Sequence, residues 1–208
     1  MGHAAGRTRR FLLAAVGILL LIALVGIPRP AAAAEDAASF LNNLGQRVLA
    51  LIRDKQAPEA QRKQQFEQLA TQSFDIPKIA QFVLGRYWRT ADEAQRQQFI
   101  QAFTAYMIRV YWSRFNQYAG ESFKVTGQRQ ETNGATLVST EIIQSNGKPP
   151  AKVDWWVIKS GNGYKITDVS IEGVSQAVTY RQEFASVIER GGGQVSALIN
   201  QLRQRASS

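Results

Sequence analysis

Two aspartates in neighbouring strand-like segments are the side chains best suited by spacing to acid–base chemistry. Asp154 and Asp168 would lie on adjacent strands, where one carboxyl group could act as general acid and the other as general base. Lys152 and Lys165 stand close to them in the sequence. The strand register derived below does not place the two carboxyl groups directly opposite each other. We therefore interpret both aspartates as structural or solvated, and a catalytic pair is the alternative.

A possible serine nucleophile follows the last of these segments. Gly173-Val174-Ser175-Gln176-Ala177 nearly matches the Gly-x-Ser-x-Gly turn, with alanine in the last position. The only histidine, His3, lies in a segment predicted to be removed, and the chain has no cysteine. Without imidazole or thiol groups, a serine triad, a cysteine nucleophile and the usual zinc sites are excluded. We expect a helix N-cap role for Ser175, no enzymatic activity and no cofactor or metal.

The run Arg86-Tyr87-Trp88-Arg89 has two interpretations that the sequence leaves open. Its cations and phenol could bind a phosphate group, or its amphipathic side chains could form the rim of a helix end. A phosphate-binding glycine loop is absent from the sequence, because the glycines at 191–193 follow a helical segment instead of opening one.

The chain is basic, with a formal net charge of +9. Removal of residues 1–34 would delete four arginines and no acid, which leaves +5. Lys and Arg are spread along the chain instead of forming a clustered stripe, so nucleic-acid binding is not expected. A moderate charge of this kind suits weak attraction to anionic membrane surfaces or acidic partner proteins.

The N-terminus is typical of a secretory signal. Three arginines precede an uncharged apolar run from Phe11 to Ile27, which is followed by two prolines and four alanines. We predict a periplasmic protein cleaved after Ala34, or after Ala33 as the second choice. Residues 35–208 would then form a single domain. The alternative is an uncleaved anchor, because the 17 apolar residues could just span a thin bilayer.

Helical periodicity governs the first half of the mature chain, and it returns after Gly173. The richest apolar stripe follows Thr90 and Glu93, which have the spacing of a capping box, and it ends near Gly120. This pattern predicts a long amphipathic helix. The residues on its apolar face are Phe99, Ile100, Phe103, Met107, Val110, Tyr111 and Phe115.

Residues from about 122 to 172 have the period of two that is typical of strands. Asn-Gly pairs, a strong hairpin signal, separate four segments. The segments are 122–131, 135–144, 151–160 and 164–172. The sequence therefore predicts an α+β fold, in which a four-stranded antiparallel meander packs with N-terminal and C-terminal helices.

Loop lengths predict the strand register. We expect a two-residue turn at Asn133-Gly134 and a three-residue loop at 161–163. In this register Trp156, Ile158 and Ile166 face away from Val153, so the sheet is partly apolar on both faces. One face would need a further cover, a partner or a ligand. The opposed pairs are Val125 with Ile142, Val153 with Ile171, and Trp155 with Val169.

Three segments stand in order along the mature chain: Phe82 to Arg89 (FVLGRYWR), the Gln-rich helix ending in Tyr118-Ala119-Gly120, and Asp168 to Ser175 (DVSIEGVS). Together they resemble the MlaC family, the soluble periplasmic components of the Mla lipid-transport pathway, also called toluene-tolerance proteins. The hopanoid-associated HpnM branch is similar at the same positions. The resemblance covers nearly the whole mature chain.

The resemblance implies an apolar cavity, enclosed by the sheet and helices, that holds phospholipid acyl chains while the headgroup stays near solvent. It also implies lipid exchange with an inner-membrane ABC transporter complex carrying an MCE-domain protein, and with an outer-membrane lipoprotein complex. Such a carrier would support outer-membrane lipid asymmetry, and we expect a monomer. A hopanoid or other apolar cargo is one alternative, and a small-molecule enzyme on a cone-like α+β fold is another.

We place the cavity between the sheet face that bears Val153 and the long helix that bears Phe103, because these are the largest apolar surfaces in the sequence. The opposite sheet face, with Trp156, is the alternative lining. The residues predicted to contact lipid are Phe82, Val83, Tyr87, Phe99, Phe103, Met107, Val110, Val125, Ile142, Val153, Trp155, Val157, Val169 and Ile171.

Overall fold

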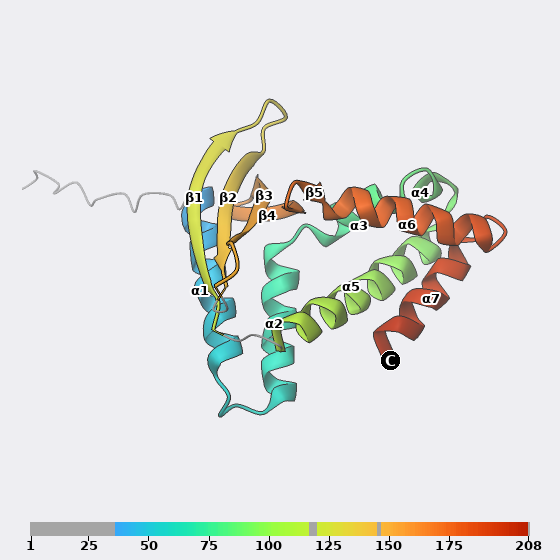
Figure 1. Ribbon diagram of the computed structural model, residues 1–208. Helices are drawn as coiled ribbons and strands as arrows, with labels where there is room; N and C mark the ends of the chain where they lie inside the picture. Colours follow the sequence, from blue (N-terminus) through green and yellow to red (C-terminus); the bar gives the residue numbers. More distant parts are fainter. Residues whose placement is uncertain (1–35, 117–119, 145–146, 208) are drawn as a thin grey trace, which may run out of the picture. The chain divides into compact units, whose positions relative to one another are not determined.

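A computed structural model describes residues 36–116, 120–144 and 147–207 (Figure 1). The predicted signal segment and its cleavage site lie outside these residues. The helices of the described part are α1 (Ala37–Arg53), α2 (Glu59–Ser73), α3 (Ile76–Leu84), α4 (Tyr87–Thr90), α5 (Glu93–Asn116), α6 (Gln176–Arg190) and α7 (Val195–Ser207). The strands are β1 (Ser122–Gln130), β2 (Thr136–Ile143), β3 (Ala151–Ser160), β4 (Gly163–Ile171) and β5 (Val174–Ser175).

Side-chain caps begin two helices that pack against the sheet. Asp36 Oδ1 accepts a hydrogen bond from the Ser39 N–H at 2.7 Å and begins α1. Ser175 Oγ accepts the Val178 N–H at 3.1 Å and begins α6. The predicted N-cap role of Ser175 is confirmed.

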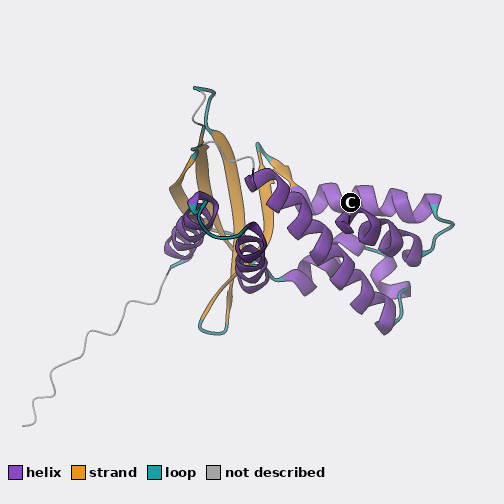
Figure 2. Cartoon of the chain, turned by 90° about the horizontal axis from the view of Figure 1, so that it is seen from below, coloured by secondary structure: helices purple, strands orange, loops and turns teal. Residues whose placement is uncertain are grey.

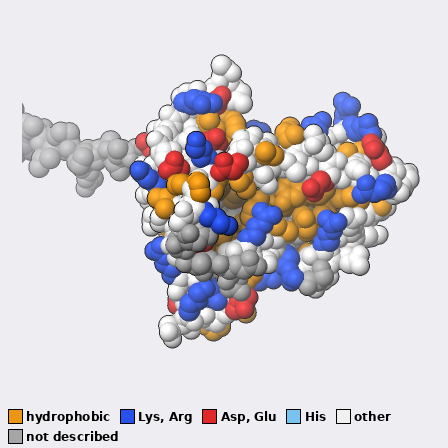
Figure 3. Space-filling view, viewed as in Figure 1, with side chains coloured by type: hydrophobic (Ala, Val, Ile, Leu, Met, Phe, Trp, Pro, Cys, Tyr) orange, Lys and Arg blue, Asp and Glu red, His pale blue; other side chains and the backbone are white. Residues whose placement is uncertain are grey.

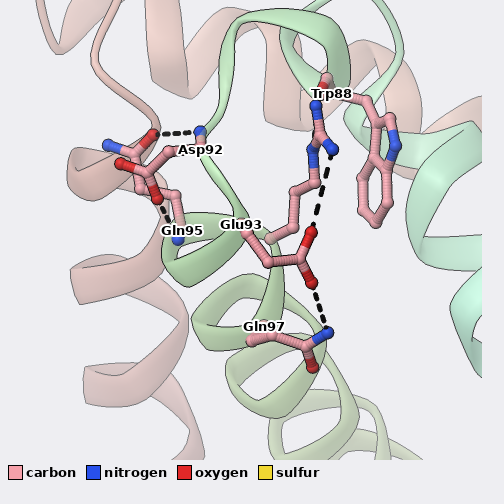
Figure 4. A network of polar contacts seen from close by, with 6 residues as sticks. Trp88, Asp92, Glu93, Gln95 and Gln97 are labelled. Atoms are coloured by element: carbon pink, nitrogen blue, oxygen red, sulfur yellow. Dashed lines mark hydrogen bonds and ion pairs between the residues drawn. The ribbon is translucent and has the colours of Figure 1, made fainter.

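The long helix α5 begins with a capping box, but at a different position from the predicted one. The Gln95 N–H donates to Asp92 Oδ1 at 2.7 Å, and the Asp92 N–H donates to Gln95 Oε1 at 3.1 Å (Figure 4). The prediction of Thr90 and Glu93 was wrong, because Thr90 belongs to α4 and its hydroxyl donates to the Tyr87 carbonyl at 3.1 Å.

The sheet is antiparallel with the strand order β1-β2-β3-β4-β5, so the predicted α+β class and the meander are confirmed. The fifth strand was not predicted. It follows a tight turn at Glu172 and Gly173, which have φ of +49° and +80°. A strand of two residues is too short to produce a period in the sequence.

The hairpin between β1 and β2 differs from the predicted register. Val125 pairs with Thr140 instead of Ile142, so that predicted pair is wrong. The loop has three residues, 132–134, and Gly134 has the left-handed φ of +81° that closes such loops. A β-bulge directly after Val125 shifts the register by a further residue.

Pairing between β3 and β4 confirms two predicted pairs, although the loop differs. The loop has two residues, Gly161 and Asn162, instead of three. Gly161 has φ +57° and holds the first central position, where type II′ hairpin turns place glycine. The confirmed pairs are Val153 with Ile171 and Trp155 with Val169.

A β-bulge after Trp156 reconciles the short loop with these pairs. Beyond the bulge, Val157 pairs with Ile166. Both side chains are fully buried in one cluster beneath α1. The prediction that Ile166 faces away from Val153 is therefore wrong.

Among the described residues, buried apolar side chains form three clusters. The helical cluster joins α3, α5, α6 and α7, and its largest members include Phe99, Phe103, Tyr180, Phe184, Ile188 and Leu198. The sheet cluster consists of Ala37, Leu41, Val138, Val157 and Ile166. The α1–α2–α5 cluster consists of Leu51, Phe66, Leu69, Ile108 and Trp112.

Asp168 ties the sheet to α6. Its Oδ1 accepts the N–H of Val169 at 2.7 Å and that of Ala177 at 3.1 Å, and its Oδ2 accepts the Ser175 hydroxyl at 2.6 Å. These bonds agree with a structural role for this carboxylate.

We predict that Asp168→Ala lowers the free energy of unfolding by about 2–4 kcal/mol, because it removes three hydrogen bonds to one charged acceptor. Urea denaturation measures the change. Asp154→Ala is the matched control, since Asp154 accepts a hydrogen bond from Ser139 at 2.6 Å, and a loss of about 1 kcal/mol is expected there. Equal losses in the two variants would contradict the anchoring role.

Candidate functional site

The seven sheet residues predicted to contact lipid share one face of the sheet. Val153 and Val157 are buried, and the other five are partly buried. Helix α1 lies along this face and contacts β1 and β2 (Figure 2). The seven are Val125, Ile142, Val153, Trp155, Val157, Val169 and Ile171.

The helix residues predicted to face this sheet surface lie elsewhere. Phe99 and Phe103 are buried in the helical cluster, where both pack edge-on against Phe184 of α6 at ring-centroid distances of 6.1 and 5.9 Å. Val83 belongs to the same cluster, and Tyr87 and Met107 pack against it. The prediction that α5 covers the sheet face is wrong. The aromatic stripe of α5 packs against α6 and α7, and the helix that covers the sheet face is α1.

Two further predicted residues lie outside these buried clusters. Phe82 on α3 is 42% exposed, and the Arg181 guanidinium lies 5.0 Å from its ring centroid. Val110 on α5 is partly buried. Twelve of the fourteen predicted residues therefore form two groups, seven on the sheet face and five in or against the helical cluster, instead of one cavity wall.

A continuous apolar layer connects the sheet with α1, α2 and α5. Leu44 of α1 packs against both the sheet cluster and the α1–α2–α5 cluster, so the two clusters share it. We call these two clusters and their partly buried neighbours the apolar layer. The neighbours are Ala38, Phe40, Leu44, Val48, Ala70, Phe74, Tyr111, Phe115, Val125, Trp155, Tyr164 and Val169.

Aromatic rings fill both ends of the apolar layer. At the helical end, Phe66 lies 5.8 Å from Trp112 and 5.3 Å from Phe115 between ring centroids. At the sheet end, Phe123 packs directly over Gly45 of α1, where an added Cβ would come within 2.5 Å of the ring. Offset and edge contacts of this kind are weak one by one.

Two grooves open beside these clusters. One, of about 470 Å³, lies between α1 and α2, and two members of the apolar layer, Leu51 and Leu69, line it among Arg47, Ala50, Asp54, Gln65, Gln68 and Gln72. The other, of about 440 Å³, lies between α6 and α7 and is edged by Glu183, Arg190 and Arg205. Both volumes fall in the range of small-molecule sites, about 300–1,000 Å³.

Figure 3 shows further apolar side chains gathered in a band over the region where Figure 1 places α3, α5 and α6. Lys and Arg side chains stand along the edges of this band. An apolar surface with a cationic rim is suited to a ligand or surface that combines hydrocarbon with negative charge.

Three tyrosines lie where α5 meets α6. The rings of Tyr106 and Tyr180 are 6.3 Å apart. Burial is the main cause that raises the pKa of both Tyr111 and Tyr180, and the charge of Arg114 opposes it. These phenols therefore stay neutral at neutral pH.

The sequence candidates for catalysis and phosphate binding are engaged in local contacts. Asp154 is opposite Ser170 and Asp168 opposite Trp156, so the carboxyl groups are not directly opposed, as expected. Arg86 pairs with Glu189 at 2.6 Å, which supports the interpretation of the 86–89 run as a helix rim.

The described part of the chain contains no group of three or more His, Cys, Asp or Glu side chains close enough to hold a metal ion. Its helices also include none with the length and hydropathy needed to cross a bilayer.

Sequence reasoning missed the residues that join α1, α2 and α5. The spacing of Leu44, Phe66 and Leu69 signalled helix faces, yet no pattern said which helix each face would meet. The burial of Arg62, which is 7% exposed, left no signal in the Gln-rich sequence of α2.

We predict that the stability of the fold decreases as pH rises from about 10 to about 12. Tyr111 and Tyr180 have pKa values raised above their ordinary value of 10.0, so the stability they contribute is complete below that pH and is lost as pH rises through the folded pKa. A Tyr111→Phe/Tyr180→Phe variant should lose less stability over the same interval in urea denaturation. An unchanged pH dependence would refute this linkage.

Comparison with known proteins places this arrangement in a family. The family model described as MlaC protein matches residues 42–204. A phospholipid-binding protein from Ralstonia solanacearum, solved in complex with a phospholipid, superposes with a TM-score of 0.71 at 28% identity, covering 83% of this chain and 97% of that one. The intermembrane phospholipid transport system binding protein MlaC of Haemophilus influenzae is 23% identical over 128 residues, which span 60% of this chain and 59% of that relative. The chain therefore belongs to the MlaC family.

Proposed function

We propose that this chain is a periplasmic carrier that binds a phospholipid by its acyl chains and shuttles it between membrane complexes. The observation that carries the proposal is the continuous apolar layer, in which one residue, Leu44, connects the sheet cluster to the α1–α2–α5 cluster. The Ralstonia relative binds phospholipid and the Haemophilus relative is named for intermembrane phospholipid transport, which supports the same ligand class here.

Lipid transfer through water needs a carrier for a simple energetic reason. Exposing one methylene group to water costs about 0.8 kcal/mol, so an acyl chain of about 15 carbons costs on the order of 12 kcal/mol. A protein interior offsets this cost if apolar side chains can separate and surround the chain. We propose that α1 and α2 move apart at the groove lined by Leu51 and Leu69, which admits acyl chains to the apolar layer.

The proposed partners are an inner-membrane ABC transporter complex that carries an MCE-domain protein and an outer-membrane lipoprotein complex. Export through cleavage near Ala34 belongs to the same proposal. Mass spectrometry of the exported protein tests it, since a chain that still begins at Met1 or Gly2 would be an anchored form instead.

Lipid analysis of the protein purified without detergent tests the ligand. We expect glycerophospholipid in near-stoichiometric amount in an organic extract, because the apolar layer suits acyl chains and the Ralstonia relative was solved with a phospholipid bound. A hopanoid as the sole extracted lipid would change the cargo, and an extract without lipid, together with failure to accept phospholipid from vesicles, would refute the carrier function.

Substitution within the layer tests the location. Val125→Asp places a charge on the partly buried face toward α1, and we expect it to remove most of the bound phospholipid, because burying an unpaired charge beside hydrocarbon is strongly unfavourable. Ile143→Asp is the matched control on the opposite sheet face, where Ile143 is 41% exposed, and its lipid content should equal that of the wild type. Circular dichroism verifies that both variants are folded. Equal lipid content in the two would place the ligand elsewhere.

A further inference from the structure

A buried arginine with two unpaired donor atoms lies beside the apolar layer. Arg62 of α2 is 7% exposed, and its Nε and Nη1 atoms are buried with no hydrogen-bond partner in the structure of the described residues. A buried guanidinium normally forms an ion pair with an acidic side chain or binds another anion, because its N–H donors lose their hydrogen bonds to water on burial. Two orphaned donors on one planar group therefore indicate a missing anionic partner.

The surroundings of Arg62 define one wall of the site. Its guanidinium carbon lies 5.6 Å from the ring centroid of Trp112 on α5. The Trp112 indole N–H donates to Glu59 Oε1 at 3.2 Å. The indole face stabilises the cation, while one carboxylate oxygen of Glu59 is engaged by the indole edge.

The start of α2 supplies a second anion-binding feature. This 15-residue helix begins after Pro58, and no side chain caps its first turn. The positive end of a helix dipole attracts anions, and uncapped N–H groups can donate to them. Side chains on a helix lean toward its N-terminus, so Arg62 in the first turn leans toward these N–H groups.

The same face of α2 is apolar beyond Arg62. Its buried residues are Arg62, Phe66, Leu69 and Ser73, in steps of three or four residues. Phe66 and Leu69 belong to the α1–α2–α5 cluster, and Leu69 also lines the groove between α1 and α2. One face of α2 thus carries a cation at one end and apolar side chains next to it. An anionic amphiphile has the complementary arrangement, with a negative headgroup joined to a hydrocarbon tail.

We propose that Arg62, with the first turn of α2, binds the phosphate of the phospholipid whose acyl chains enter the apolar layer. This inference rests on the proposed carrier function. The planar fork of the guanidinium matches two phosphate oxygens, whereas a lysine would supply only a point charge.

The experiment is a competition between two lipids that have the same tails. Lipid-stripped protein is incubated with vesicles containing equal amounts of dioleoylphosphatidylglycerol and dioleoylglycerol, and the bound ratio is measured by mass spectrometry. We expect wild type to select the phosphate-bearing lipid by about tenfold or more, the effect of one hydrogen bond to a charged group. Arg62→Gln should bring the ratio within about threefold of unity, and Arg62→Lys should be intermediate.

Matched variants separate phosphate binding from other roles of the charge. Arg89→Gln removes an exposed arginine of α4 and should keep the wild-type ratio. If Arg62 served only to balance Glu59, a Glu59→Gln/Arg62→Gln variant would regain the wild-type ratio, and that result would overturn the proposal. We expect it to retain the ratio of Arg62→Gln.

The Trp112 indole N–H resonance, assigned through Trp112→Phe, distinguishes a lipid headgroup from free phosphate. Loading with phosphatidylglycerol should shift it in wild type and not in Arg62→Gln. A shift with inorganic phosphate but none with the lipid would overturn the proposal. Failure of the carrier function has a different signature, in which neither lipid is retained by wild type. A wild-type ratio in a folded Arg62→Gln protein that retains lipid would overturn this inference alone.

Discussion

The apolar face of a twisted sheet must be covered, and the rest of this structure depends on α1 being the helix that covers it. Leu41 of α1 is 1% exposed and packs with Val138 and Val157 of the sheet. Gly45 lets the helix approach closely enough for the Phe123 ring to lie on its backbone. Because Leu44 on the same helix also contacts the α1–α2–α5 cluster, the helix that covers the sheet is the one that brings α2 and α5 to it.

The two halves of α5 have different roles as a consequence. Its first half is locked in the helical cluster by stacked and edge-on rings of Phe99, Phe103 and Phe184, which are almost fully buried. Its second half contributes Ile108 and Trp112 to the apolar layer, next to partly buried neighbours and a groove. Close-packed clusters resist insertion, since each lost contact lowers stability, whereas a partly open layer gives way at lower cost. The helical cluster is thus suited to stabilising the fold, and the apolar layer is suited to binding a ligand.

Periodicity predicted the fold class and four of the five strands because these four strands each run for eight or more residues. Register was less predictable, since two β-bulges, after Val125 and Trp156, each add a residue without a distinctive sequence. The site was least predictable. An apolar stripe such as that of Phe99 and Phe103 indicates that one face of a helix is buried. It does not indicate which other element covers that face. The burial of Arg62 could not be predicted from the sequence for a related reason, because it results from tertiary packing alone.

Among the described residues, the buried polar side-chain atoms have hydrogen-bond partners except those of Arg62. Asp168 accepts three hydrogen bonds, one from Val169 in the sheet and two from Ser175 and Ala177 at the start of α6, and burial keeps the phenols of Tyr111 and Tyr180 neutral at neutral pH. Arg62 is the contrasting case, a cation whose Nε and Nη1 donors are buried without an acceptor beside hydrocarbon contacts. A folded chain tolerates such an uncompensated charge at a cost in stability. An amphiphilic anion can offset that cost and fill the adjacent apolar layer in the same step. Binding of such a ligand would therefore also stabilise the fold.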